Sequence, residues 1–173
     1  MKIAIVGSHG VGKSTLSRNL SKILNLPILP DIAAEAFHRG LPVNENTPLE
    51  LQFWFFARQW EAEKYSEGGW IADKCLVDYS VYGDVLLSDQ RAKELLSEMT
   101  RKNSQYDFVF YLPIEFSIEA DGRSTDIEFQ AAIDRHFLET LDTWGIKYYV
   151  VSGTVKQRLK RILEIIIENG EVV

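Results

Sequence analysis

Residues 7–14 read Gly-Ser-His-Gly-Val-Gly-Lys-Ser and lie between an apolar run at residues 2–6 and a helical pattern that begins at Ser14. They match G-x-x-x-x-G-K-[ST], the pattern of phosphate-binding loops. The glycines let consecutive backbone N–H groups turn inward around phosphates, and the helix that follows points its positive end at them. We therefore predict that the chain binds a nucleoside triphosphate. The alternative is a glycine-rich turn that holds no ligand.

Two side chains of this loop have expected chemical roles. Lys13 is expected to reach the β- and γ-phosphates, and Ser14 to ligate Mg²⁺. The complete expected nucleotide-binding set of the loop is Gly7, Ser8, His9, Gly10, Val11, Gly12, Lys13, Ser14 and Thr15.

Composition limits the number of domains and the kinds of partner. The chain has 173 residues, 46% hydrophobic and 25% charged, so we expect one domain with a substantial core over residues 1–173. A net charge of −6 and a pI near 5.1 disfavour a basic nucleic-acid-binding surface, although a local positive groove stays open. A free nucleoside or nucleotide is the simpler partner.

Cysteine content and apolar runs indicate the compartment. Cys75 is the single cysteine, so neither an intramolecular disulfide framework nor a cysteine-rich metal site is expected. No apolar run approaches the length of a membrane span, and the chain begins with strand-like sequence rather than a leader. We expect a cytoplasmic protein that does not enter a membrane.

Strand-like and helical segments alternate along the chain. Strands are expected at residues 2–6, 27–30, 70–72, 108–112 and 147–151. Helices are expected after the phosphate-binding loop, from Asp31 to about Arg39, from Thr47-Pro48 to about Tyr65, and around residues 92–99, 127–141 and 155–166. This alternation predicts a three-layer α/β/α fold with a five-stranded parallel sheet, whose ligands gather at the carboxyl ends of the strands.

Together with the loop, Asp31, Asp73-Lys74-Cys75, the segment 121–126 and Ser152-Gly153-Thr154 make the chain similar to the P-loop nucleoside and nucleotide kinases. Within that group it most resembles small bacterial and phage proteins similar to nicotinamide riboside kinases and deoxynucleoside monophosphate kinases. The resemblance covers nearly the whole chain. It implies ATP and Mg²⁺ as cofactors and a small-molecule acceptor for the phosphoryl group.

The resemblance implies an acceptor-side carboxylate at the end of the second strand, where such kinases orient or deprotonate the acceptor hydroxyl. Asp31 occupies that place and, with Lys13, is a catalytic candidate. Its alternative role is the N-cap of a helix. Glu35 lies one helical turn further on, where it either faces the same pocket or is exposed.

Asp73 ends the third expected strand, where the resemblance implies a second Mg²⁺-organising group acting through water. The alternative is a residue that simply ends the strand in a turn. This chain departs from its relatives in having Lys74 where they carry Arg, and Ala34 where many carry Arg. Lys74, Arg39 and Arg58 are the cations proposed to contact the substrate.

A third catalytic candidate is Arg123, in a lid-like segment at about residues 115–126. The resemblance implies that an arginine of this segment closes over the transferred phosphate. Solvated loop residues are the alternative. Ser152, Gly153 and Thr154 follow the last expected strand, where related kinases hold the adenine with backbone groups. The aromatic cluster at residues 53–56 either packs in the core or lines a base pocket.

Three functional hypotheses follow. The first is a kinase that transfers the γ-phosphoryl group of ATP to a nucleoside or nucleoside monophosphate. The second is a P-loop ATPase or regulatory module, with GTPase activity disfavoured because no N-K-x-D motif occurs. The third is a phage-type kinase that acts on a modified base in DNA, which the acidic net charge disfavours. The acceptor and the oligomeric state stay open.

Overall fold

The structure is a computed structural model that describes residues 1–116 and 126–170. Strands and helices alternate along the described chain. The strands are β1 (Lys2–Val6), β2 (Trp70–Ala72), β3 (Phe108–Tyr111) and β4 (Tyr149–Val150). The helices are α1 (Lys13–Leu24), α2 (Ile32–His38), α3 (Leu49–Tyr65), α4 (Leu76–Leu86), α5 (Gln90–Asn103), α6 (Ile127–Thr143) and α7 (Val155–Glu168). None of these helices is long and apolar enough to cross a bilayer.

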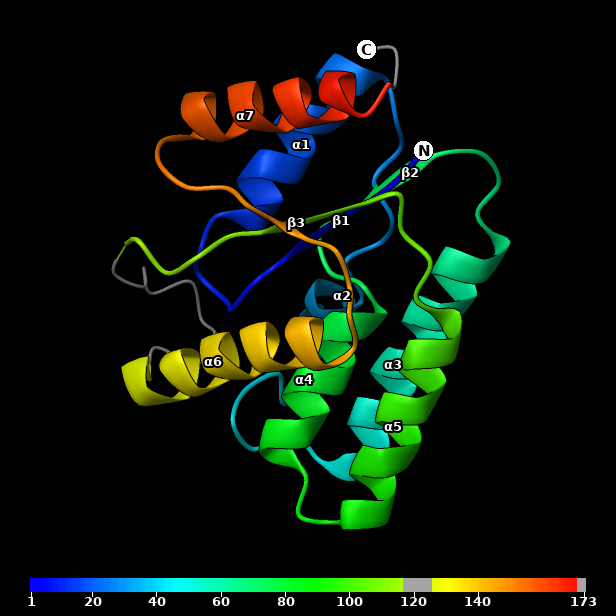
Figure 1. Ribbon diagram of the computed structural model, residues 1–173. Helices are drawn as coiled ribbons and strands as arrows, with labels where there is room; N and C mark the ends of the chain where they lie inside the picture. The colour runs from blue at the N-terminus through cyan, green and yellow to red at the C-terminus, as the bar shows by residue number, and fades with distance from the viewer. Residues whose placement is uncertain (117–125, 171–173) are drawn as a thin grey trace.

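The strands form one parallel sheet in the order β2-β1-β3-β4. Helices α1 and α7 cover one face, while α4 and α6 cover the other (Figure 1). Because all strands run in the same direction, their carboxyl ends meet along one edge of the sheet. This arrangement confirms the predicted three-layer α/β/α class.

The predicted number of five strands is wrong for the described residues, since the sheet has four strands. The segment 27–30 contributes a single parallel bridge between Ile28 and Ile71. Its backbone makes two hydrogen bonds to Ile71, through the amide of Leu29 and the carbonyl of Pro27, each 2.9 Å long. Prolines at both ends of this segment lack the N–H group that would extend the ladder.

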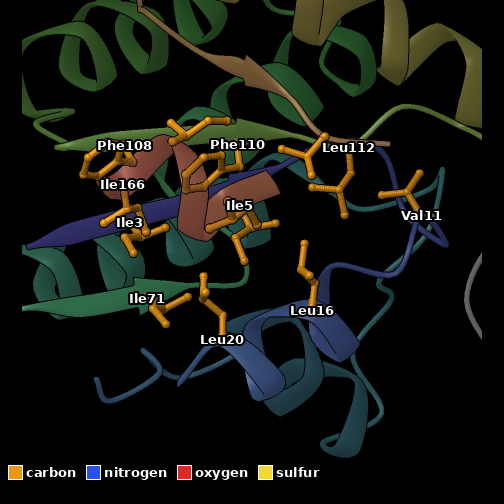
Figure 2. Close-up of a cluster of buried hydrophobic side chains, with 13 residues drawn as sticks. Ile3, Ile5, Val11, Leu16, Leu20, Ile71, Phe108, Phe110, Leu112 and Ile166 are labelled. Carbon is orange, nitrogen blue, oxygen red and sulfur yellow. The ribbon is translucent and has the colours of Figure 1, made fainter. Parts of the chain in front are cut away.

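Successive side chains along the central strands point to opposite faces of the sheet and build a separate core on each face. Ile3 and Ile5 of β1 point toward α1 and α7, and Figure 2 shows them packed with Leu16, Leu20 and Ile166. The alternate residues of β1 and β3 pack instead against α4 and α6, in a cluster that includes Ala4, Val6, Val109, Ile133 and Phe137. Burial on both faces explains why the strands read as continuous apolar runs.

Helix α4 was not expected from the sequence. Its residues from Leu76 to Val81 are all buried, because α3, α5 and α6 pack around it. A helix that is buried all round has no polar face and therefore no amphipathic period. Hydrophobic spacing alone could not identify this helix.

The predicted cap of α3 by Thr47 is also wrong. The N-cap of this helix is Pro48, and the Thr47 hydroxyl hydrogen-bonds within the preceding loop, to the carbonyls of Pro42 and Asn44. Thr47 therefore stabilises the loop that leads into α3 rather than the helix itself.

Candidate active site

The glycine-rich loop connects β1 to α1 at the carboxyl edge of the sheet. Gly7, Gly10 and Gly12 have φ angles of 138°, 78° and 92°, in the region that favours glycine. A Cβ on Gly7 would lie 2.5 Å from the carbonyl oxygen of Leu112, so a side chain there would collide with the backbone. These positions therefore need glycine, as the motif predicts.

Lys13 is buried, and its ammonium group lies against the loop. Its Nζ donates hydrogen bonds to the carbonyls of Gly7 at 2.5 Å and Ser8 at 2.7 Å. The positive charge is thereby held at the centre of the loop, where the phosphates of a bound nucleotide would lie.

Two side chains from distant helices brace carbonyls of the loop. Gln130 of α6 donates a 2.7 Å hydrogen bond to the carbonyl of His9. Arg158 of α7 donates a 2.6 Å bond to the carbonyl of Val11. Both side chains are almost fully buried, so the shape of the loop is fixed by packing from both faces of the sheet.

A cleft of about 420 Å³ lies over the loop. Its walls include residues 9–16, and Asp73, Lys74, Gly153 and Val155 also line it. This volume lies within the range of small-molecule sites. The cleft therefore joins the expected phosphate site to the loop after β4.

Asp73 lies at the carboxyl end of β2, beside the phosphate-binding loop. Burial raises the pKa of Asp73, while the nearby charge of Lys13 and a hydrogen bond from the Ser14 side chain oppose this rise. Ser14, Asp31 and Asp73 also line one small cavity. A hydroxyl and a carboxylate next to a phosphate site are the hard oxygen ligands that Mg²⁺ uses together with water and phosphate oxygens, so the residues fit this ion.

Asp31 does cap α2, as its alternative role anticipated. Its Oδ1 accepts a 3.0 Å hydrogen bond from the amide of Ala34. The same carboxylate lies close enough to Asp73 to contribute to the raised pKa of Asp73. The cap thus fixes the Asp31 carboxylate at the phosphate end of the site, and the two roles are compatible.

A second pocket adjoins the loop on the side of α3, α4 and α6. Several aromatic side chains line it. Phe55 and Tyr79 stack with ring centroids 5.6 Å apart and planes 25° apart, and Tyr82 and Phe129 also belong to its walls. Of the aromatic cluster in α3, Phe55 lines this pocket, while Phe56 is buried in a core between α3, α4 and α5. Core packing is therefore confirmed for Phe56, while Phe55 lines a pocket for which a bound base stays a prediction.

The cleft over the glycine-rich loop and the aromatic pocket share two wall residues, His9 and Lys74. The His9 ring is buried, lies 3.1 Å from the Tyr82 hydroxyl and packs against Phe129 at 5.5 Å between centroids. The two cavities are therefore neighbours, separated by the loop that would hold the phosphates.

The other proposed substrate residues lie elsewhere. Glu35 forms ion pairs with Arg39 at 3.3 Å and Arg58 at 3.8 Å, and Arg39 lies over the ring of Trp54. These partly exposed charges bind one another at the α2–α3 surface, and the walls of the two cavities are formed without them. Lys74 is the member of the proposed set that reaches both cavities.

The loop after β4 is held by a residue that the sequence did not single out. Both carboxylate oxygens of Glu115 accept a hydrogen bond from the Gly153 amide, at 3.0 and 2.8 Å. Glu115 also forms an ion pair with Arg158 at 2.6 Å. Thr154 caps α7 together with Gln157.

Arg123 and most of the proposed lid, residues 117–125, lie outside the described residues.

A buried acidic network lies behind the β2–α4 turn. Glu63 of α3 accepts hydrogen bonds from Gln59, from the amide of Leu76 and from the Tyr106 hydroxyl. Gln59 also donates to the carbonyl of Lys74, at 2.9 Å. Despite these donors, burial raises the pKa of Glu63 from its ordinary value of 4.5 to about 7.

Glu63→Gln should make folding stability less dependent on pH. Between pH 4.5 and 7 the unfolded chain releases the Glu63 proton and the folded chain keeps it, so this group's contribution to stability falls as pH rises. The neutral glutamine lacks this penalty. The variant's free energy of unfolding relative to wild type should therefore increase by about 2 kcal/mol from pH 5 to pH 8. Urea unfolding at both pH values measures it.

The control for this comparison is Glu67→Gln, which removes one negative charge at an exposed position after α3. A stability difference that stays the same at both pH values for Glu63→Gln would show that burial does not hold the Glu63 proton.

The sequence allowed Arg158 either near the base or on a solvated face of its helix, and its burial excludes the solvated face. Several polar residues at or near the site carried a signal in the sequence. Arg158 follows Val155 by three residues and precedes Ile162 by four, so a cation interrupts the apolar stripe of α7. Gln52 and Gln59 likewise fall on the buried stripe of α3. A polar residue at a core position needs a hydrogen-bond partner or a ligand. Glu115 had no comparable signal in the sequence.

A protein family described as AAA domain matches residues 2–158 of the chain. No curated protein matches the sequence.

Solved structures share the fold. A deoxyadenosine kinase from M. mycoides, with the products dCMP and dCDP bound, superposes with a TM-score of 0.76 at 21% identity, over 98% of this chain and all of that one. A thymidylate kinase from Candida albicans superposes with a TM-score of 0.70 at 20% identity, and the match covers 97% of this chain and 91% of that kinase. A NadR protein in complex with NR gives 0.82 at 18% identity; the match covers 99% of this chain and 52% of NadR. At these identities the similarity establishes the fold.

Proposed function

The chain belongs to the AAA domain family, and from that premise we propose that it is an ATP-dependent kinase of nucleosides or nucleoside monophosphates. One observation carries the proposal: the cleft over the glycine-rich loop and the aromatic pocket share the wall residues His9 and Lys74. A triphosphate on one side of the loop and a flat base on the other would bring the γ-phosphate and an acceptor hydroxyl together. The kinases of similar fold support this reading.

The proposed transfer is a direct displacement. The acceptor oxygen, which is a hydroxyl of a nucleoside or a phosphate oxygen of a nucleoside monophosphate, bonds to the γ-phosphorus. The bond from that phosphorus to the β–γ bridging oxygen breaks, and ADP leaves. When the acceptor is a nucleoside, its hydroxyl proton passes to the carboxylate of Asp31. Such a transfer depends mainly on positioning and on stabilising charge.

The phosphate-binding residues divide this work. Lys13 stabilises negative charge on the β- and γ-phosphate oxygens, and loop amides bind the remaining oxygens. Ser14 and Asp73 would hold Mg²⁺, which when bound neutralises phosphate charge. Arg123 is proposed to close over the transferred group. Ser152, Gly153 and Thr154 are proposed to border the adenine.

The acceptor pocket is expected to open on binding. Its volume of about 50 Å³ is well below that of typical ligand sites, and its outer wall includes Val43, Asn44 and Thr47 from the loop before α3. We expect this loop to move outward when the base enters. Return of the loop over the bound acceptor would then exclude water from the reacting phosphate.

The proposal is tested by ADP release from Mg·ATP, measured with nucleosides, with nucleoside monophosphates, with duplex DNA and with no acceptor. A kinase of small acceptors gives ADP that depends on a nucleoside or a monophosphate. ADP release that is equal without acceptor would instead indicate an ATPase. Release that requires DNA would indicate a kinase of bases in DNA.

A further inference from the structure

Three buried polar atoms of the aromatic pocket have no hydrogen-bond partner within the described part of the chain. They are Oε1 of Gln52 on α3, and Oδ1 of Asp78 and the hydroxyl of Tyr79 on α4. All three residues line the pocket, with exposed fractions of 2%, 0% and 4%. Leaving such atoms unpaired is costly, and all three residues line one cavity, so a ligand that enters this cavity as it opens can supply the missing hydrogen bonds.

The unpaired atoms are mainly acceptors. An amide oxygen accepts hydrogen bonds and does not donate them, and the Tyr79 hydroxyl can do either. Burial raises the pKa of Asp78 to about 6, so above neutral pH its carboxylate is ionised and only accepts. Its other oxygen, Oδ2, is already used by the amide of Cys75, at 2.9 Å. Gln52 and Asp78 therefore each require a donor from the ligand.

The walls beside these acceptors suit a flat ring. The stacked pair of Phe55 and Tyr79, with the rings of Tyr82 and Phe129, supplies apolar surface on several sides. A nucleobase has such a ring and carries its hydrogen-bonding groups on the edge. The edge presented to Gln52 and Asp78 must carry N–H groups.

Resting on the proposed kinase function, we propose that the acceptor is a nucleoside or nucleotide whose base carries an exocyclic amino group. One such nitrogen offers two N–H donors, which can satisfy two acceptors. Uracil and hypoxanthine carry a carbonyl oxygen at the corresponding position. The ring N–H beside that oxygen is a single donor, so at least one of the oxygens of Gln52 and Asp78 would stay unpaired.

Binding of matched nucleosides tests the inference without requiring turnover. Isothermal titration in the presence of Mg²⁺ and AMP-PNP compares cytidine with uridine and adenosine with inosine, each as the nucleoside and as the 5′-monophosphate. The amino-bearing member should bind about tenfold tighter or more in at least one pair. Equal or tighter binding of the uracil and hypoxanthine compounds would overturn the inference, and so would the absence of binding by all the nucleosides and monophosphates. Phosphorylation of some other acceptor would then leave the kinase function intact.

Variants of Gln52 test the named contact. Gln52→Glu keeps an acceptor oxygen and should keep the preference for the base with the amino group. Gln52→Met removes the acceptor oxygen and should lower this preference about tenfold. Gln90→Met makes the same change on the exposed surface of α5 and should leave the preference unchanged. The ratio of the two affinities is the readout, because general damage to the pocket would weaken both members alike. A wild-type ratio in Gln52→Met would overturn the role of Gln52.

Discussion

Replacing Lys13 with methionine is expected to lower kcat for phosphoryl transfer by about 10²–10³-fold. The side chain is nearly as long but carries no charge, so the loop loses the cation that its carbonyls hold at the phosphate site. Buried methylene groups are replaced by comparable apolar bulk, and the fold should persist. Steady-state kinetics with a saturating acceptor measure the effect, and circular dichroism checks the fold.

Lys22→Met is the matched control. Lys22 lies in the last turn of the same helix, α1, where its side chain is exposed. This variant should keep wild-type kcat. A kcat for Lys13→Met within threefold of the control would remove Lys13 from the catalytic machinery.

Asp31→Asn is expected to lower kcat by about 10²-fold while leaving the KM for ATP nearly unchanged. Asparagine caps a helix about as well as aspartate, so α2 keeps its N-terminus. The carboxylate that would receive the hydroxyl proton is lost. Measuring kcat and both KM values separates a defect in transfer from a defect in nucleotide binding.

The control for this substitution is Asp89→Asn. Asp89 caps α5 in the same way that Asp31 caps α2. Its Oδ1 accepts hydrogen bonds from the amides of Arg91 and Ala92. If both variants match wild type in kcat, Asp31 is a helix cap without a role in transfer.

The fold class could be predicted because its signals are local. The glycine-rich loop fixed the position of β1 and α1, and helices α6 and α7 carried clear amphipathic spacing. The features that sequence reasoning missed depend on tertiary packing. Helix α4 is enclosed by three other helices, and the segment at Ile28 pairs too briefly to form a strand.

The two halves of the candidate site differ in the same way. The proposed nucleotide-side residues of the loop follow one another in the chain, so a motif describes them, and Asp73 could be proposed because a strand ends there. The acceptor-side pocket is assembled from α3, α4 and α6, far apart in sequence. Gln52 and Asp78 acquire significance there only because folding buries their polar atoms at one cavity. No local pattern expresses that convergence.

The most direct test is to identify the product. Wild-type protein and Lys13→Met are incubated with Mg·ATP and separate pools of nucleosides and nucleoside monophosphates, and the acceptors are analysed by mass spectrometry. We expect an acceptor heavier by one phosphate, formed in amounts equal to the ADP released and nearly absent with Lys13→Met. ADP formed by the wild type while every acceptor keeps its original mass would contradict phosphoryl transfer to a nucleoside or nucleotide.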